Sequence, residues 1–293
     1  MPQKTAEYQG PWARDTFNIS ADLTPLLLEA LLPVCPNNHN SCAPVYDAPI
    51  ILLSPGYRGS RLYYNVVASA IASEGFMVIT MDHPGETNAI TYPDGHAVYS
   101  DLPNVMDISE LAPYAYVRAA DAVFVIDQLN NATAVAELLP EHTFQKLPAD
   151  RVAMLGHSLG GAAAVIAASL DPRIHAVINL DGPFLGSLPP AGLPQPVLFI
   201  ATEREESLWS ETWPELKGPK QCIEVSNLTH EGEDTAYWAG LMGEIAPMQW
   251  LHILGAYTKE WVNGAFSGKV GGPLLQGQEP RFPEVTTLSK DNF

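Results

Sequence analysis

The stretch RVAMLGHSLGGAAAVIAASL, residues 151–170, decides the fold because it changes from one kind of structure to another within a few residues. The apolar run at 152–157 is typical of a buried β-strand. Gly156, Gly160 and Gly161 then flank Ser158, and a run rich in Ala, Val and Ile follows. This order matches the G-x-S-x-G pattern, in which a sharp strand-to-helix turn lifts the serine hydroxyl above the edge of a sheet. The alternative, a glycine-rich helix start with an incidental serine, is disfavoured by the flanking strand and helix.

Short apolar runs and helical stretches alternate along the rest of the chain. This alternation predicts an α/β fold with a mostly parallel central sheet and helices on both faces. The other strands are expected at residues 50–54, 77–82, 176–181, 197–202 and 222–226. The helices are expected at residues 63–74, 114–129, 160–170 and 233–254.

The chain, residues 1–293, is predicted to form one domain with three less regular parts. Residues 1–48 are expected to be an N-terminal extension with antiparallel edge strands. Residues 83–112 lack clear periodicity and are a candidate lid or substrate-binding loop, because long connections inside compact domains are commonly functional. Residues 264–293 are rich in Gly and Pro and are expected to be an irregular C-terminal tail.

The composition excludes several classes of function. Hydrophobic residues make up 46% of the chain, and the formal net charge is −18 at pH 7. That charge argues against binding to nucleic acid or to anionic membrane surfaces, which are themselves negative. No apolar run is long enough to cross a bilayer, so no integral membrane contact is expected. The first residues lack the apolar run of a secretory signal, so the expected location is the cytoplasm or, for a mature form without its signal, the exterior. The oligomeric state stays open.

Cys35 and Cys42 bracket a short polar segment, CPNNHNSC. A local disulfide and a pair of loop thiols are both compatible with this spacing. No metal site is expected, because His39 adds too few ligands for a tetrahedral zinc. No organic cofactor is expected either.

Ser158 needs a base, because a neutral serine hydroxyl is a poor nucleophile until a histidine accepts its proton. In the chain order typical of this motif, the histidine follows the serine and the acid. His230 lies just beyond the strand at 222–226, where a base would reach the serine. His175 lies at the start of a strand, on the opposite edge of the sheet, and His252 lies inside a helical pattern, so both are weaker candidates.

The acid that orients the base has alternative positions. Asp181 ends the strand at 176–181 and precedes Gly182-Pro183, whereas Glu203 and Glu205 follow the next strand. Asp181 is favoured, because the following turn fixes its side chain. Its role would be to hold the His230 imidazole in the correct tautomer.

Two backbone amides are needed to bind the negative oxygen of the tetrahedral intermediate. The first candidate is the amide of Leu159, directly after the serine, and the second is the amide of Tyr57 in the segment SPGYRG, residues 54–59. Substrate contacts are expected from apolar side chains near these positions, with ordinary packing as the alternative for each. They are Tyr92, Tyr99, Phe184, Leu185, Trp209 and Trp213.

Four segments together resemble the plasma-type platelet-activating-factor acetylhydrolases and their fungal relatives. They are SPGYRGSRLYYNVVASAIASEGFMVITMDH (54–83), GHSLGGAAA (156–164), NLDGPF (179–184) and Thr229-His230. The resemblance runs from about residue 48 to about residue 242 and implies a serine esterase of the α/β-hydrolase fold. It also implies Ser158 as nucleophile, Asp181 as acid, His230 as base, and the amides of Tyr57 and Leu159 as oxyanion donors. The chain departs from the family at Pro55-Gly56, where a His-Gly pair is usual, and Tyr57 replaces a smaller apolar residue.

The predicted function is hydrolysis of a small-molecule carboxylic ester through an acyl-enzyme, with an apolar or aromatic ester favoured by the aromatic segments near the site. The same residues could instead cleave a polyester or a thioester, or form a lactone in a secondary-metabolite pathway, because one fold supports many chemistries. A non-catalytic relative that binds a ligand in the same pocket is the alternative from another class.

Overall fold

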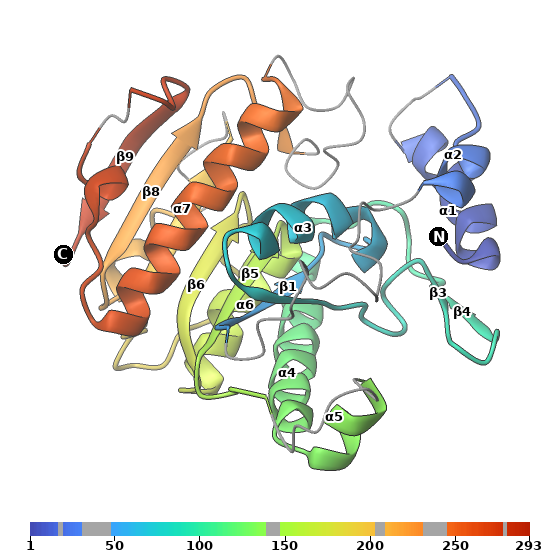
Figure 1. Ribbon diagram of the computed structural model, residues 1–293, viewed down its shortest axis with the longest axis horizontal. Helices are drawn as coiled ribbons and strands as arrows, with labels where there is room; N and C mark the ends of the chain where they lie inside the picture. Colours follow the sequence, from blue (N-terminus) through green and yellow to red (C-terminus); the bar gives the residue numbers. More distant parts are fainter. Residues whose placement is uncertain (17–19, 31–47, 139–146, 203–208, 231–244, 278–279) are drawn as a thin grey trace, which may run out of the picture.

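The computed structural model describes residues 1–16, 20–30, 48–138, 147–202, 209–230, 245–277 and 280–293 (Figure 1). Within them, the central sheet has seven strands in the order β2-β1-β5-β6-β7-β8-β9. Its strands are β1 (Ile50–Ser54), β2 (Met77–Thr80), β5 (Val152–His157), β6 (Ile174–Leu180), β7 (Val197–Ala201), β8 (Lys220–Val225) and β9 (Val285–Asp291). All neighbouring strands are parallel except β8 and β9. The α/β class is confirmed, and each predicted strand is present with small shifts at its ends.

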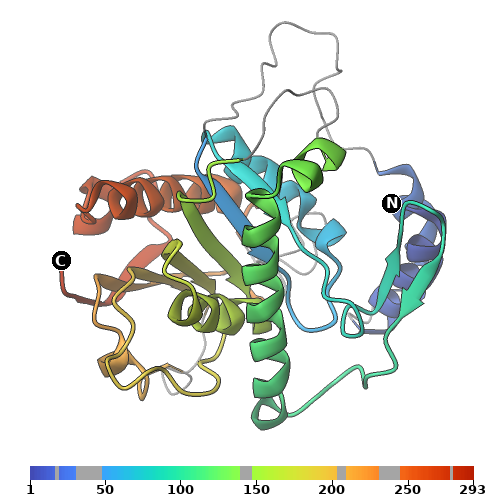
Figure 2. The ribbon, with the colours of Figure 1, turned by 90° about the horizontal axis from the view of Figure 1, so that it is seen from below.

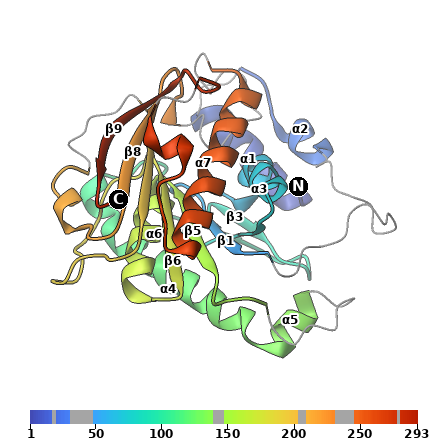
Figure 3. The same ribbon diagram turned by 60° about the vertical axis from the view of Figure 1, so that its left-hand side comes forward.

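Helices cover both faces of the sheet, as Figures 1 and 3 show. The covering helices are α3 (Asn65–Ser73) and α7 (Pro247–Ser267) on one face, and α4 (Ala112–Leu129) and α6 (Leu159–Leu170) on the other. The short helix α5 (Ala132–Leu138) follows α4.

The sequence of β1 explains why both faces are covered. Successive side chains of a strand point to opposite faces. Ile51 and Leu53 therefore join the core beside α3 and α7, whereas Ile50 and Leu52 join the core beside α4 and α6. Because all five positions of this strand are buried and the first four are apolar, the strand is stable only inside the sheet with helices on each side.

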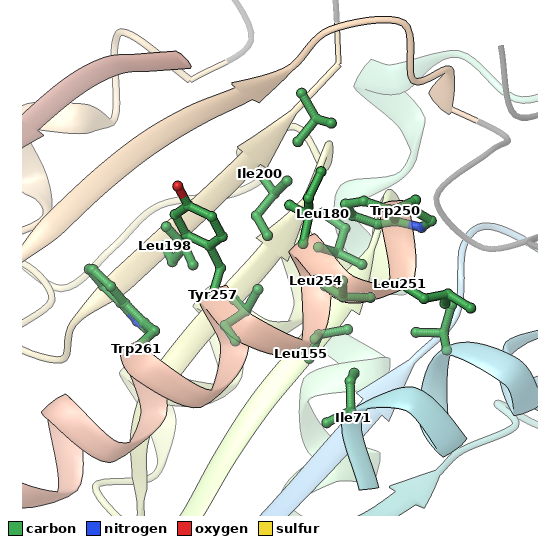
Figure 4. Close-up of a cluster of buried hydrophobic side chains, with 14 of the residues drawn as sticks. Ile71, Leu155, Leu180, Leu198, Ile200, Trp250, Leu251, Leu254, Tyr257 and Trp261 are labelled. Atoms are coloured by element: carbon green, nitrogen blue, oxygen red, sulfur yellow. The ribbon is translucent and has the colours of Figure 1, made fainter. Parts of the chain in front are cut away.

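Figure 4 shows the core between α7 and the sheet. Leu254 and Tyr257 of α7 lie beside Leu180 of β6 and Leu198 of β7, and all four side chains are buried. Burial of each such side chain contributes about 1.5–3 kcal/mol to the stability of the fold. This packing keeps the sheet rigid beneath the ends of its strands.

The expectation of edge strands in residues 1–48 is wrong for the described part of that segment. Residues 3–16 form helix α1 (Gln3–Thr16), and α2 (Thr24–Glu29) follows. Ala6 and Ala13, seven residues apart on one helical face, are both fully buried. The α1 helix packs against a hairpin of β3 (Ala89–Thr91) and β4 (Ala97–Tyr99), as Figure 2 shows. This hairpin is the regular part of residues 83–112.

The expectation of an irregular tail at residues 264–293 is also wrong. The first of these residues continue α7 to Ser267, and β9 pairs antiparallel with β8 at the end of the chain. Val285 is the fully buried side chain of β9, while most of the others are exposed. The strand therefore carries almost no apolar pattern and is held mainly by backbone hydrogen bonds to β8.

Two further predictions concern residues that lie, wholly or in part, outside the described ranges. The helix expected at 233–254 starts at Pro247 in the described residues, and residues 231–244 lie outside them. Cys35, His39 and Cys42 also lie outside the described residues.

Candidate active site

The turn after β5 holds Ser158 in a strained conformation. Its backbone has φ 53° and ψ −121°, a region that residues with a side chain rarely adopt. Such strain persists only where the surroundings impose it, and it is common at functional sites. β1, β5 and β6 end at the same level, since Ser54 pairs with Gly156, and Gly156 with Asn179. Ser158 therefore lies at the carboxyl edge of the sheet, half buried at the start of α6.

Glycines allow the close approach of backbone segments around this turn. A Cβ atom at Gly156 would lie 2.0 Å from the carbonyl oxygen of Gly160. A Cβ atom at Gly160 would lie 2.2 Å from the carbonyl oxygen of Ser54. Both obstacles are backbone atoms, so the motif needs glycine at these positions.

We expect Gly160→Ala to lower the free energy of unfolding by about 3 kcal/mol or more, because the new methyl group overpacks a site walled by backbone. Gly277→Ala is the matched control, since nothing lies within 4 Å of its Cβ position. The control should change stability by less than about 1 kcal/mol. Urea unfolding followed by circular dichroism measures both, and equal stability of the two variants would contradict this account of the turn.

Asp181 and His230 are in direct contact. The Oδ2 atom of Asp181 lies 2.6 Å from Nδ1 of His230. The same carboxylate accepts hydrogen bonds from the Thr202 amide at 3.1 Å and from the Thr202 hydroxyl at 2.8 Å. A carboxylate only accepts, so Nδ1 of His230 carries the proton and Nε2 presents a lone pair. This is the tautomer that a general base requires.

His157, directly before the serine, connects this pair to the turn. Its Nε2 atom lies 2.9 Å from the carbonyl oxygen of His230, and the two rings lie 4.6 Å apart between centroids. A carbonyl only accepts, so Nε2 of His157 donates. Its Nδ1 atom then accepts from the hydroxyl of Tyr64, 2.8 Å away. The main chain of His230 is thereby bonded to the residue next to Ser158.

The two expected oxyanion donors are the amides of Leu159 and Tyr57. Leu159 is the first residue of α6, where an amide has no partner within the helix. Tyr57 follows Gly56, which packs against His157. Within the described residues, neither the Leu159 amide nor the Tyr57 amide donates to an acceptor of the chain. The role of these two N–H groups as oxyanion donors stays a prediction.

The other candidates for base and acid are placed as follows. His175 is exposed at the start of β6, at the far end of that strand from Ser158, and it bonds to the carbonyl oxygen of Arg173. His252 is exposed on α7. Glu203 and Glu205 lie outside the described residues. Among the described candidates, the structure thus pairs Asp181 with His230.

The expected substrate contacts fall into two groups. Phe184 and Leu185 follow Asp181 directly and are half buried. Trp209 is buried and packs on Trp213, with 5.1 Å between ring centroids, and both pack on Phe199 of β7. The Trp213 indole also donates to Asp291 at the end of β9. The two tryptophans thus have ordinary packing partners.

The aromatic side chains of the hairpin also have neighbours of their own. Tyr92 stacks on His96, with 4.4 Å between ring centroids, and Tyr99 lies 5.3 Å from Tyr8 of α1. A role for Tyr92 in substrate binding stays a prediction.

A second serine, histidine and acid form a chain of contacts that starts at Ser54, the first residue of the Ser54–Gly59 segment. The Ser54 hydroxyl lies 2.9 Å from Nε2 of His83, and Nδ1 of His83 lies 2.7 Å from Asp121. Burial, with Arg118 nearby, lowers the pKa of His83 below its usual value. Ser54 is fully buried, so no substrate reaches it. This second set of residues is a structural hydrogen-bond chain and not a second active site.

An ion pair between Arg118 and Glu86 was not expected from the sequence. Arg118 is fully buried, and its Nε atom lies 2.5 Å from Glu86 Oε2. Burial alone would raise the pKa of Glu86, but the guanidinium outweighs it and holds that pKa below its usual value. One signal was present in the sequence: Arg118 stands among Ala115, Ala119 and Ala122, on the face of α4 that faces the core.

The described residues contain no group of three His, Cys, Asp or Glu side chains placed to hold a metal ion. In the same part of the chain, no helix is both long enough and apolar enough to cross a bilayer.

The α/β hydrolase fold family model matches residues 49–218. A probable 1-alkyl-2-acetylglycerophosphocholine esterase of Arthroderma benhamiae is 28% identical, over 83% of this chain and 67% of that protein. The platelet-activating factor acetylhydrolase of the dog is 27% identical, over 59% of this chain and only 43% of that protein. A ferulic acid esterase from Streptomyces cinnamoneus has a similar structure, with a TM-score of 0.73, 26% identity, and coverage of 84% of this chain and 75% of the other.

These matches confirm the resemblance to platelet-activating-factor acetylhydrolases and to fungal esterases. The relatives are esterases and acetylhydrolases by name, and the sheet described above is mostly parallel with helices on both faces, as in an α/β fold. The chain therefore belongs to the α/β-hydrolase fold family and is an enzyme of its esterase type.

Proposed function

We propose that the chain is a serine esterase in which Ser158 is the nucleophile, His230 the base and Asp181 the acid. The observation that carries this proposal is the 2.6 Å contact between Asp181 Oδ2 and His230 Nδ1, at the edge of the sheet where Ser158 lies. The contact leaves Nε2 of His230 as the group that accepts the serine proton. The amides of Tyr57 and Leu159 serve as the oxyanion donors.

The proposed reaction has two acyl-transfer steps. Ser158 Oγ attacks the ester carbonyl carbon while His230 Nε2 takes its proton, and the carbonyl oxygen becomes an oxyanion. The C–O bond to the alcohol then breaks, and His230 gives the proton to the leaving oxygen. Water attacks the acyl-enzyme in the same way, with His230 as base, and the carboxylic acid leaves. Each oxyanion donor typically lowers the free energy of the transition state by about 3 kcal/mol.

The proposed substrate is an ester with an apolar or aromatic group beside the bond that is cleaved. Half-buried apolar side chains close in sequence to the proposed acid, or at the proposed donor itself, pack against the core beside α4 and α6, among them Tyr57, Phe184 and Leu185. The net charge of −18 also disfavours anionic substrates. The relatives are named for an acetyl ester and for ferulic acid esters, which fit such a site. A panel of an acetyl phospholipid, a feruloyl ester, a polyester film and a thioester would rank the alternatives by kcat/KM.

The test of the catalytic proposal is covalent labelling. A fluorophosphonate should modify the native chain once, at Ser158, as mass spectrometry of the digested protein would show. Ser158→Ala should remove the label completely. Ser54→Ala is the matched control from the buried Ser54–His83 pair and should still be labelled at Ser158. An unlabelled native chain would instead support the non-catalytic ligand-binding alternative.

A further inference from the structure

We infer that the buried Arg118–Glu86 ion pair is a positioning group that turns the Tyr57 amide toward the substrate oxygen. The inference rests on the proposed function, since it assumes that Tyr57 donates to the oxyanion. It concerns two buried residues that lie outside the motifs described above and that bond to the Ser54–Gly59 segment.

The ion pair holds three consecutive peptide units of this segment. Arg118 donates through Nη1 to the carbonyl oxygen of Pro55 and through Nη2 to that of Gly56, the latter at 2.9 Å. Glu86 Oε1 accepts from the amide of Arg58 at 2.9 Å. Its two oxygens also receive Nε and Nη2 of Arg118, at 2.5 Å each. The guanidinium and the carboxylate therefore act as one rigid template for residues 55–58.

This template fixes the direction of the Tyr57 amide. In a trans peptide, the carbonyl oxygen and the amide hydrogen point in opposite directions. The Gly56 carbonyl points at Arg118, so the N–H of Tyr57, in the same peptide unit, points away from the guanidinium. Within the described residues it meets no acceptor of the chain. The donor is thus directed before any substrate binds.

The neighbouring peptide is held from both ends. Its carbonyl, from Pro55, faces Arg118, and its amide, from Gly56, donates to the Tyr64 hydroxyl at 2.8 Å. Tyr64 in turn donates to His157, which lies directly before Ser158. The segment therefore cannot rotate its peptides without breaking buried hydrogen bonds, and a buried group left unpaired is costly.

Arginine is needed for this arrangement. Its planar guanidinium donates to Glu86 and to two carbonyl oxygens at the same time, whereas a lysine ammonium is a compact charge on a flexible side chain. A fixed donor stabilises the transition state without reorganisation, so loss of the guanidinium should slow chemistry more than it weakens substrate binding.

The test is Arg118→Lys, which keeps the charge opposite Glu86. We expect kcat for p-nitrophenyl acetate to fall about 100-fold, because loss or misplacement of an oxyanion donor has effects of this size. KM should change less than about threefold. The affinity for a trifluoromethyl ketone, which forms a tetrahedral oxyanion on the serine, should fall by the same factor as kcat/KM. A folded variant with kcat within threefold of native would overturn the inference.

Leu129→Ala is the matched control, because Leu129 is buried on the same helix but makes none of the contacts to residues 55–58. It should lower the melting temperature while kcat and inhibitor affinity stay close to native. Equal losses of kcat in both variants would show that only general stability matters and would overturn the inference.

If Arg118→Lys does not fold, the native chain decides the question. In a crystal structure with a phosphonate bound to Ser158, the phosphoryl oxygen should lie within hydrogen-bonding distance of Tyr57 N while the Gly56 carbonyl stays on Arg118. A rotated peptide or an oxygen bonded elsewhere would overturn the inference. Failure of the fluorophosphonate to label native Ser158 would instead refute the proposed function itself, so the two failures are distinguishable.

Discussion

Replacing His230 by glutamine is expected to lower kcat by about 10⁵- to 10⁶-fold, the largest effect of any substitution outside Ser158. Glutamine has no basic nitrogen, so the serine proton has no acceptor and the leaving alcohol has no donor. Residual turnover would come from the oxyanion donors and from substrate binding. Because the base acts only in the chemical steps, kcat and kcat/KM should fall together. Steady-state kinetics with p-nitrophenyl acetate measure both quantities.

The chain supplies matched controls for this substitution. His175 and His252 are exposed and lie away from the Asp181–His230 pair, so His175→Gln and His252→Gln should stay within about twofold of native. The fold of His230→Gln is checked by its melting temperature. Near-native turnover in this variant, together with loss in either control, would move the base to another element.

The elbow and the strands were predictable because their signals are local. The glycines around Ser158 are needed by atoms a few residues away, and the strands at 50–54 and 152–157 are apolar at nearly every position. Close contacts between near neighbours and the burial of whole strands can therefore be predicted from the local residue pattern. The same reasoning explains why the positions of Asp181 and His230, each just beyond the end of a strand, could be predicted to lie close together, as their 2.6 Å contact shows.

The elements that were missed depend on partners far along the chain. β9 is defined by its hydrogen bonds to β8. Because most of its side chains are exposed, its own sequence shows no apolar pattern that would predict a strand. The sequence of α1 is largely polar, so it does not predict a buried helix. The buried face of α1 forms only through packing against the hairpin of β3 and β4. In both cases, long-range contacts outweigh weak local preference.

The Arg118–Glu86 pair illustrates the same limit within the candidate site. The two residues are 32 positions apart, and neither belongs to the motifs from which the candidate site was predicted. The helical phase of Arg118 predicts that it is buried, but only the fold brings Glu86 and the Pro55–Gly56 carbonyls to its guanidinium. The sequence motifs thus indicated candidates for the reaction, whereas the contacts of the Arg118–Glu86 pair became visible only in the structure.

Asp181→Asn is expected to lower kcat by about 10⁴-fold while the fold stays intact. The surroundings of Asp181 predict how the asparagine will be oriented. The Thr202 amide is a fixed donor at 3.1 Å from Oδ1, so the asparagine carbonyl must face it. The amide NH₂ then takes the position of Oδ2 and faces Nδ1 of His230, while the Thr202 hydroxyl can turn to accept from it. Nδ1 must then be unprotonated, so the neutral imidazole carries its proton on Nε2 and cannot accept one from Ser158.

Three variants separate this account from its alternatives. Thr202→Val removes only the hydroxyl bond to Asp181 and leaves the tautomer correct, so its kcat should fall by about tenfold or less. Glu203→Gln and Glu205→Gln, at the rival acid positions, should keep near-native turnover. The tautomer of His230 can be read from the ¹⁵N chemical shifts of its ring in native protein and in Asp181→Asn. An unchanged tautomer with high turnover in Asp181→Asn, and an inactive Glu203→Gln or Glu205→Gln, would place the acid after β7, because only a carboxylate that orients the imidazole can have this effect.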